Sequence, residues 1–351
     1  MKSAGCSAAG LSLYERIISI DNLYSAFYAF RKGKRYKEGI PEFEYGLERE
    51  IFQLGRELKK FLYNPLPPKG FMVQEPKRRF IEAARVRDRV VHHALVSQIG
   101  PVFEPAFIFD SYACRPAKGT LYAVRRLEEF WRRESGNYSR KIYFLKADVR
   151  KYFDSIDHEI LLGILRKKIS CPATIWLIKT ILAGHRPTAG GGERTGQVKG
   201  LPIGNLTSQL FANIYLNELD QFAKHVLKAK FYIRYVDDFI IISRDRAYLA
   251  ALIVPIESFL KECLKLDLHP IKRKIFSSRS GLDFLGYFIR PYYKIIRFGN
   301  KKRFLRKVAG YKKEGLWNRK KEQSFAAWQG YARQADSYNL IRNIAGMIGK
   351  A

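Results

Sequence analysis

Two adjacent carboxylates in an apolar stretch are the residues of this chain best suited to chemistry. Asp237 and Asp238 lie in the motif Tyr-Val-Asp-Asp, between apolar runs at residues 231–233 and 239–242. Successive side chains of a strand point to opposite faces, so two consecutive acids in a buried hairpin cannot both reach water, and a buried unpaired carboxylate is costly. A bound cation would remove that cost. A β-turn at the tip of the hairpin, where Asp bonds the nearby backbone, explains the same residues without a metal.

A third acid, Asp148, follows another apolar run. Residues 142–145 predict a buried strand and residues 160–168 an amphipathic helix, so Asp148 would meet the hairpin acids across a sheet. Nucleotidyl transfer needs such a meeting, because two Mg²⁺ ions about 4 Å apart activate a 3′ hydroxyl and stabilise the leaving pyrophosphate oxygens. Mg²⁺ prefers oxygen ligands and takes only one or two protein carboxylates besides waters and phosphates. Asp148 and Asp237 are the predicted pair.

The order of four motifs resembles that of a reverse transcriptase. Asp148 is followed five residues later by the aromatic Phe153, and then come Leu-Pro-x-Gly, Tyr-x-Asp-Asp and Phe-Leu-Gly-Tyr. Within the group II intron-like superfamily, residues 87–95, 201–209 and 215–220 most resemble the enzymes of diversity-generating retroelements. This resemblance implies an RNA-directed DNA polymerase that makes error-prone, adenine-directed cDNA from a template RNA.

The resemblance also implies the fold class, an α+β right-hand polymerase with fingers, palm and thumb. Its palm would be a β-sheet backed by helices, and its thumb would be helical. The implied domains are an N-terminal extension and fingers at residues 1–115, a palm at residues 116–290 with a fingers insertion at about 165–199, and a basic thumb at residues 291–351.

The catalytic centre and the primer grip follow from the same resemblance. Asp148, Asp237 and Asp238 would be both catalytic residues and Mg²⁺ ligands, and the backbone carbonyl of Val149 would add a further oxygen. The primer grip, which would position the primer 3′ end, is assigned to Phe284, Leu285, Gly286 and Tyr287. An ordinary core hairpin is the alternative for these four residues.

Three cations are assigned to the incoming nucleotide. Lys77 and Arg79 match the fingers residues that hold the triphosphate and pack on the base, and a planar guanidinium suits both tasks. A solvated basic turn is the alternative for this pair. Lys272 would lie near the triphosphate and donate a proton to pyrophosphate, although Arg273 and Lys274 compete for that assignment.

Selectivity for sugar and base is assigned to two further segments. By the same resemblance Tyr152 and Phe153 would contact the nucleotide, and the Phe153 ring would clash with a ribose 2′ hydroxyl and so favour deoxynucleotides, with core packing beside Tyr152 as the alternative for Phe153. Ile203 stands where many reverse transcriptases carry Gln, and the loss of a polar contact there would weaken discrimination between bases. Its alternative is packing under the loop. Gly204 would let the backbone approach the nucleotide closely.

Residues 109–120 resemble a further shared block that opens the first palm helix. Thr120 would cap that helix, and Arg115 and Lys118 would contact template phosphates. An ordinary loop is equally compatible with these residues.

Charge indicates the class of partner. The chain has 64 Lys and Arg against 33 Asp and Glu, a net charge of +31, which favours a polyanion such as nucleic acid. We expect no membrane association, because no amphipathic or lipidated anchor is found. The four cysteines show no Cys-x-x-Cys spacing, which favours reduced thiols in a cytoplasmic protein.

The expected partners are a template RNA, the RNA/cDNA duplex and deoxynucleotide triphosphates. The family adds the expectation of a small basic accessory protein. The competing hypotheses are a group II intron-like, retron or defence-associated reverse transcriptase, and an RNA-binding relative that has lost synthesis. The joint presence of the three acids with Lys77 and Arg79 argues against the last.

Overall fold

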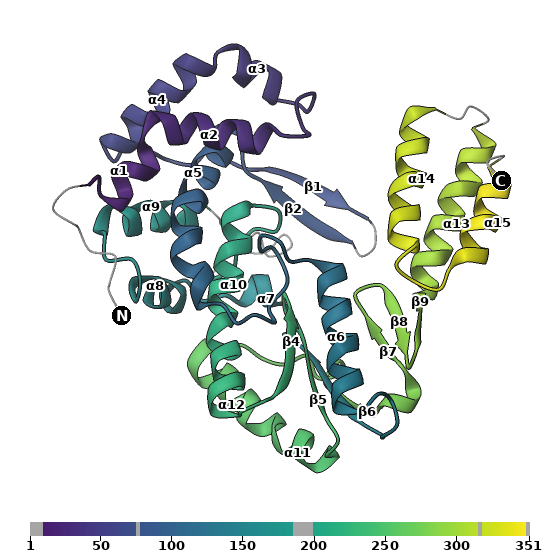
Figure 1. Cartoon of the computed structure of the whole chain (residues 1–351). Coiled ribbons are helices and arrows are strands. Elements are labelled where there is room, and N and C mark those ends of the chain that lie inside the picture. Colours follow the sequence, from purple (N-terminus) through teal and green to yellow (C-terminus); the bar gives the residue numbers. More distant parts are fainter. Residues whose placement is uncertain (1–9, 75–77, 185–198, 315–317, 349–351) are drawn as a thin grey trace.

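The computed structural model describes residues 10–74, 78–184, 199–314 and 318–348. Figure 1 shows a central sheet with one group of helices above it and a separate bundle of helices beside it. The predicted α+β class is confirmed by this mixture of helices and sheets.

The N-terminal helices pack around the long helix α5. Ser12 and Glu15 form a reciprocal cap that fixes the first helix, and Ile51, Leu54 and Leu58 line the buried face of the fourth. A two-stranded antiparallel hairpin separates the fourth helix from the fifth. The elements are α1 (Leu13–Ile18), α2 (Ile20–Arg31), α3 (Ile40–Tyr45), α4 (Leu47–Lys59), β1 (Lys69–Val73), β2 (Arg79–Ala83) and α5 (Val86–Phe103).

The central sheet is antiparallel throughout and has the strand order β4-β5-β3-β6. Helices cover it on both sides. The elements of this region are α6 (Thr120–Glu134), β3 (Tyr143–Asp148), α7 (Tyr152–Ser155), α8 (His158–Arg166), α9 (Pro172–Ala183), α10 (Leu206–Gln221), β4 (Phe231–Tyr235), β5 (Asp238–Ser243), α11 (Arg246–Ala251), α12 (Ile253–Leu264) and β6 (Lys274–Ser277).

Strand alternation divides the sheet between two cores. Leu145 and Ile241 belong to the large core that includes residues of α5, α10 and α12. Phe144 and Ile240, their neighbours in sequence, belong to the core formed with α6. This two-residue period explains why the strands read as nearly continuous apolar runs.

A second sheet connects the palm to the C-terminal helices. Its order is β7 (Leu282–Phe284), β8 (Tyr287–Arg290) and β9 (Tyr293–Ile296), and it shares the core of α6. The thumb helices are α13 (Phe298–Lys313), α14 (Arg319–Ala332) and α15 (Tyr338–Met347). Phe304 and Trp328 stack at 4.2 Å between ring centroids in their common core. The sheet palm and the helical thumb match the predicted right hand.

None of the described helices combines the length and the apolar character needed to span a bilayer.

Candidate active site at the end of the palm sheet

A tight turn between β4 and β5 presents the paired acids. Tyr235 pairs with Asp238, so Val236 and Asp237 form the turn itself. Val236 has a φ of 57°, which is rare for a β-branched residue and costs of order 1–3 kcal/mol. The motif therefore forms the tip of a hairpin, and the strain at Val236 is a feature that functional sites often carry.

The third acid meets the hairpin at the same end of the sheet. In the β3–β5 register Asp148 lies opposite Asp238. The Val149 amide donates to the Asp237 carbonyl oxygen over 3.2 Å, which extends the pairing beyond β3. The backbone thus brings Asp148, Asp237 and Asp238 together, as the sequence predicted.

Asp238 is held in an electrostatically costly position. Burial raises the pKa of Asp238 to about 6, and the nearby charges of Asp148 and Asp237 also raise this pKa, while Lys146 opposes the shift. Lys146 Nζ lies 3.3 Å from Asp238 Oδ2. The other carboxylate oxygen, Oδ1, is buried and has no hydrogen-bond partner among the described residues.

These properties fit a divalent cation, because a buried carboxylate oxygen without a donor beside two further acids is an oxygen-rich, anionic setting. In the described part of the chain, no group of three or more His, Cys, Asp or Glu side chains is arranged so that it could by itself hold a metal ion. Mg²⁺ does not need such a cage when substrate phosphates complete its ligand set. Val149 is buried and bridged to Leu268, and the role of its carbonyl as a ligand stays a prediction.

Lys272 is the cation of its segment that reaches the acids. Its ammonium forms an ion pair with Asp148. Arg273 instead pairs with Glu257, and Lys274 is exposed in β6. Of the three competing cations, Lys272 is therefore the one placed at the site.

Arg234 supports the turn and was not identified from the sequence. It is buried and forms a two-point ion pair with Asp220 of α10, at 2.7 and 2.6 Å. Its Nη1 donates to the Val236 carbonyl oxygen over 2.9 Å. A lone Arg inside an apolar strand, with an Asp in the preceding helix, was the signal that could have revealed this pair.

The aromatic pair after Asp148 is divided between core and surface. Tyr152 is buried, and its hydroxyl donates to the Ala212 carbonyl oxygen over 2.5 Å. This placement contradicts direct contact of Tyr152 with a nucleotide, because the ring faces the core. Phe153 is only half-buried, and its carbonyl accepts from the Leu201 amide over 2.8 Å. Phe153, the residue expected to exclude a ribose 2′ hydroxyl, is thus hydrogen-bonded to the Leu-Pro-x-Gly loop.

The Leu-Pro-x-Gly loop lies against the fingers hairpin, which is formed by β1 and β2. Gly204 has a φ of 112°, and a Cβ there would be 3.3 Å from Ile81 of β2. Ile203 is half-buried beside it. Arg79 begins β2, where its backbone pairs with Val73. Lys77 lies outside the described residues.

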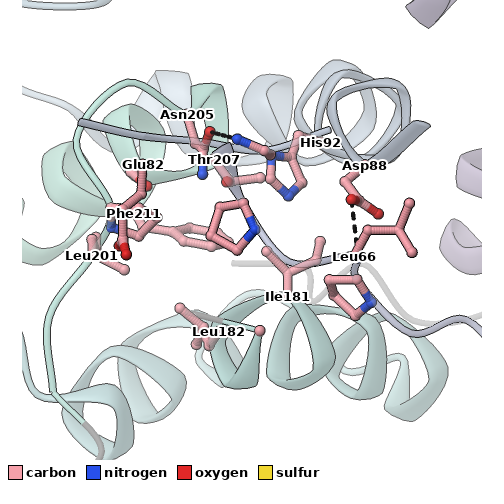
Figure 2. Close-up of a pocket in the computed structure, with 16 residues that line it drawn as sticks. Leu66, Glu82, Asp88, His92, Ile181, Leu182, Leu201, Asn205, Thr207 and Phe211 are labelled. Carbon is pink, nitrogen blue, oxygen red and sulfur yellow. Dashed lines mark hydrogen bonds between the residues drawn. The ribbon is translucent and has the colours of Figure 1, made fainter. Parts of the chain in front are cut away.

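A pocket behind this loop is lined by polar and apolar groups. Figure 2 shows Leu201 and Asn205 of the loop, His92 of α5 and Ile181 of α9 around it. Burial lowers the pKa of His92 to about 3, and its Nδ1 has no hydrogen-bond partner among the described residues. Asp88 accepts from the Leu66 amide over 3.1 Å. Buried polar groups of α5 therefore line the same pocket as the loop.

The candidate primer grip is the turn between β7 and β8. Phe284 and Tyr287 are buried, so they belong to the core, and Leu285 and Gly286 form the turn. The Gly286 carbonyl oxygen accepts from the Tyr331 hydroxyl over 2.6 Å and from the Arg297 amide over 2.9 Å. The thumb is thus docked directly on this turn.

One expectation for residues 109–120, the capping role of Thr120, is wrong. Gly119, not Thr120, is the N-cap of α6, and the Thr120 hydroxyl lies 3.1 Å from that of Tyr235. Arg115 is held by Glu104 at 2.7 Å and by two backbone carbonyls, and its contact with a template phosphate stays a prediction. The Lys118 ammonium packs over the Phe109 ring.

Comparison with known proteins identifies relatives of this chain. A family described as "Reverse transcriptase (RNA-dependent DNA polymerase)" matches residues 68–289. Protein YkfC of Escherichia coli (strain K12) is 29% identical over 273 residues, which cover 68% of this chain and 70% of YkfC. Group II intron-encoded protein LtrA of Lactococcus lactis subsp. cremoris is 29% identical over 219 residues, 61% of this chain but only 34% of LtrA. A solved structure of apo telomerase from Candida tropicalis has a TM-score of 0.48 at 13% identity, covering 67% of this chain and 57% of that one.

Proposed function

Because the chain belongs to the reverse transcriptase (RNA-dependent DNA polymerase) family, we propose that it copies a template RNA into complementary DNA at the end of its palm sheet. The observation that carries this proposal is the meeting of Asp148, Asp237 and Asp238 at one end of β3, β4 and β5. The reactants would be a primer 3′ end on the template RNA and deoxynucleotide triphosphates.

Asp148 and Asp237, with Asp238 and the carbonyl of Val149, would hold Mg²⁺. When bound, Mg²⁺ would activate the primer hydroxyl and neutralise charge on the departing pyrophosphate. Lys272, paired with Asp148, would exchange that partner for the triphosphate and protonate the leaving pyrophosphate. Phe153 would exclude a 2′ hydroxyl.

The fingers hairpin and the loop would bind the nucleotide together. Gly204 packs on β2, whose first residue is Arg79, so the base and the triphosphate would lie between these two elements. Lys77 and Arg79 would contact the triphosphate, and Ile203 would face the base. Tyr152 is better placed to support Phe153 from the core.

The test of this function is primer extension on a defined RNA template. Asp148→Asn and Asp237→Asn should each abolish Mg²⁺-dependent synthesis and leave RNA affinity nearly unchanged, because phosphate contacts lie elsewhere. Asp21→Asn, on the surface of α2, is the charge-matched control and should extend normally. Normal extension by either active-site variant would disprove the assignment of the acids.

We further propose that this reverse transcriptase belongs to a diversity-generating retroelement and is error-prone opposite template adenine. Ile203 at the loop supports this, since an apolar contact discriminates less than a hydrogen bond. A small basic accessory protein would assist it. A group II intron-like, retron or defence-associated enzyme is the alternative, and the similarity to LtrA supports the first of these.

The error spectrum distinguishes these alternatives. cDNA made on an RNA template should carry far more misinsertions opposite adenine than opposite the other bases, and substitution of Ile203 or Arg79 should change that bias. Each tenfold change corresponds to about 1.4 kcal/mol between competing transition states, which one lost hydrogen bond can supply. A low, uniform error rate with the native RNA and any required partner present would exclude the diversity-generating assignment alone.

A further inference from the structure

We propose that Lys146 is a positioning residue that fixes the catalytic hairpin, formed by β4 and β5, relative to the primer grip, which is the turn between β7 and β8. This inference rests on the proposed function and adds a role for a residue outside the sequence motifs. Lys146 lies in β3, two residues before Asp148 and on the same face of the strand.

Its ammonium contacts both elements at once. Nζ lies 3.3 Å from Asp238 Oδ2 at the start of β5 and donates to the Asp283 backbone carbonyl in β7 over 2.8 Å. It also lies 5.9 Å from the centroid of the Phe284 ring, the first residue of the candidate primer grip. The Lys146 side chain is 24% exposed, so water screens these contacts only partly.

The contacts continue into the thumb. The Asp283 carboxylate pairs with Arg297, which is the N-cap of α13. The Arg297 amide donates to the Gly286 carbonyl oxygen over 2.9 Å. One ammonium therefore stands between the catalytic hairpin on one side and the primer grip with its docked thumb on the other.

This link is significant because, among the described strands, the palm sheet and the β7-β8-β9 sheet share no backbone ladder. Their relative position depends on the short connection at residues 278–281, on apolar packing, which is non-directional, and on side-chain bonds such as those of Lys146. Packing alone would permit small sliding movements between the two sheets. An ammonium shared by a carboxylate and a carbonyl defines one arrangement.

The consequence for synthesis concerns the primer 3′ hydroxyl. It would be held by the β7–β8 turn and must meet the acids of β3 and β5. A misplacement of about 1 Å can cost about a hundredfold in rate. Loss of Lys146 should therefore lower the rate of the chemical step more than it lowers nucleotide binding.

The experiment compares Lys146→Met, Lys146→Arg and Lys274→Met in the full chain. Lys274 is the matched control, since it lies directly opposite Lys146 in the neighbouring strand, is exposed, and has no ion pair within the described ranges. An RNA template with an annealed DNA primer is used under single-turnover conditions. The readouts are the rate constant at saturating nucleotide, the nucleotide Kd, the active fraction and the melting temperature.

For Lys146→Met we expect the rate constant of the active fraction to fall by about 10- to 100-fold, with the nucleotide Kd changed by less than about threefold. Lys146→Arg should recover most of the rate, because a guanidinium also donates to two acceptors. Lys274→Met should behave as the wild type.

The positioning role would be overturned by a wild-type rate for Lys146→Met, by an equal loss in Lys274→Met, or by a loss confined to the active fraction and melting temperature. A higher nucleotide Kd with an unchanged rate would also overturn it, because Lys146 would then act on the nucleotide. Absence of synthesis by the wild type would instead refute the proposed function itself.

Discussion

Arg234 is the side chain on which the geometry of the Val236–Asp237 turn depends most directly. It is bonded to the strained Val236 through that residue's carbonyl, and to Asp220 by two hydrogen bonds. Tyr232 adds a hydroxyl donor to the same Asp220 carboxylate at 2.7 Å. A charge pair this deeply buried is tolerated because its donors and acceptors are satisfied.

Removing one member of this pair should destabilise the protein strongly. Asp220→Asn or Arg234→Met leaves an uncompensated buried charge, and we expect each to lower the free energy of unfolding by about 3–5 kcal/mol. Urea unfolding at neutral pH measures the change. The double variant should be less destabilised than the sum of the singles, and singles within about 1 kcal/mol of the wild type would contradict the importance of the pair.

His92 gives a prediction for pH. Burial lowers its pKa to about 3 in the folded state, whereas an unfolded chain takes up the proton near pH 6.5. The unfolded state therefore binds more protons between these values, so this part of the stability is complete above about pH 6.5 and is lost as the pH falls toward 3. His92→Gln should remove up to about 1.4 kcal/mol per pH unit of that slope.

Urea titrations between pH 6.5 and 4 would measure this slope. The surface variant His225→Gln is the control and should retain the wild-type pH dependence. An unchanged slope in His92→Gln would show that His92 does not contribute to acid sensitivity.

The acids of the site could be predicted from the sequence, but their supports could not. Asp148, Asp237 and Asp238 stand out because acids are unusual beside apolar strands. Lys146 does not stand out, since a single Lys in a strand has no meaning until its partner is known, and Arg234 stands out only as a charge inside an apolar strand whose partner the sequence leaves open. Those partners, the Asp283 carbonyl and Asp220, are brought close only by the fold.

At the scale of elements, the periodic patterns were reliable and the local details were less so. The buried strand expected at residues 142–145 is observed as β3, which runs from Tyr143 to Asp148, and the helix expected at residues 160–168 is observed as α8, from His158 to Arg166. The N-cap of α6 was misassigned to Thr120 because Thr commonly caps, whereas Gly119 has a φ of 133° there. A required backbone conformation outweighed the capping preference.

Gly286 tests the docking of the thumb on the primer grip. It has a φ of 94°, and a Cβ would lie 2.7 Å from Asn300 Nδ2 and from the Tyr331 hydroxyl oxygen. Gly286→Ala should therefore displace α13 and α14, lower stability by about 1–3 kcal/mol and shorten the products of a single binding event. Melting temperature and product length on a trapped template are the measurements.

Gly299→Ala is the matched control for this change. Gly299 lies in α13, and a Cβ at this position would point into open space, so Ala should be tolerated and should favour the helix. Wild-type product lengths from Gly286→Ala would show that the thumb does not need this contact for extension.

At the scale of the whole molecule, the enzyme class predicted from the sequence, an RNA-directed DNA polymerase, is confirmed by the family match over residues 68–289. The predicted fold class is confirmed as well. The domain boundaries at residues 115 and 290 stay predictions. Ordered motifs carry the enzyme class because their chemistry requires fixed residue types, whereas a boundary between packed domains leaves no comparable signature.

The chain has a net charge of +31, and most of its electrostatic attraction for a primer–template duplex should come from the thumb. Each phosphate that a cation neutralises contributes about −0.9 to the slope of log affinity against log salt for a duplex. Replacing four exposed cations of α13 by Gln should reduce that slope by up to about 3.6 for a primer–template, with the rate on bound primer unchanged. The four positions are Lys301, Lys302, Arg306 and Lys307.

The control separates local contact from total charge. It carries four substitutions to Gln at exposed positions on other elements, so its net charge is identical. If affinity depended on net charge alone, both proteins would show the same reduced slope. We expect the control to stay close to the wild type, because exposed charges beyond a Debye length of about 10 Å at 0.1 M salt are screened from the duplex. Equal slopes in the two variants, measured by anisotropy across a salt series, would contradict binding of the duplex along α13. The control positions are Lys59, Lys60, Arg246 and Lys261.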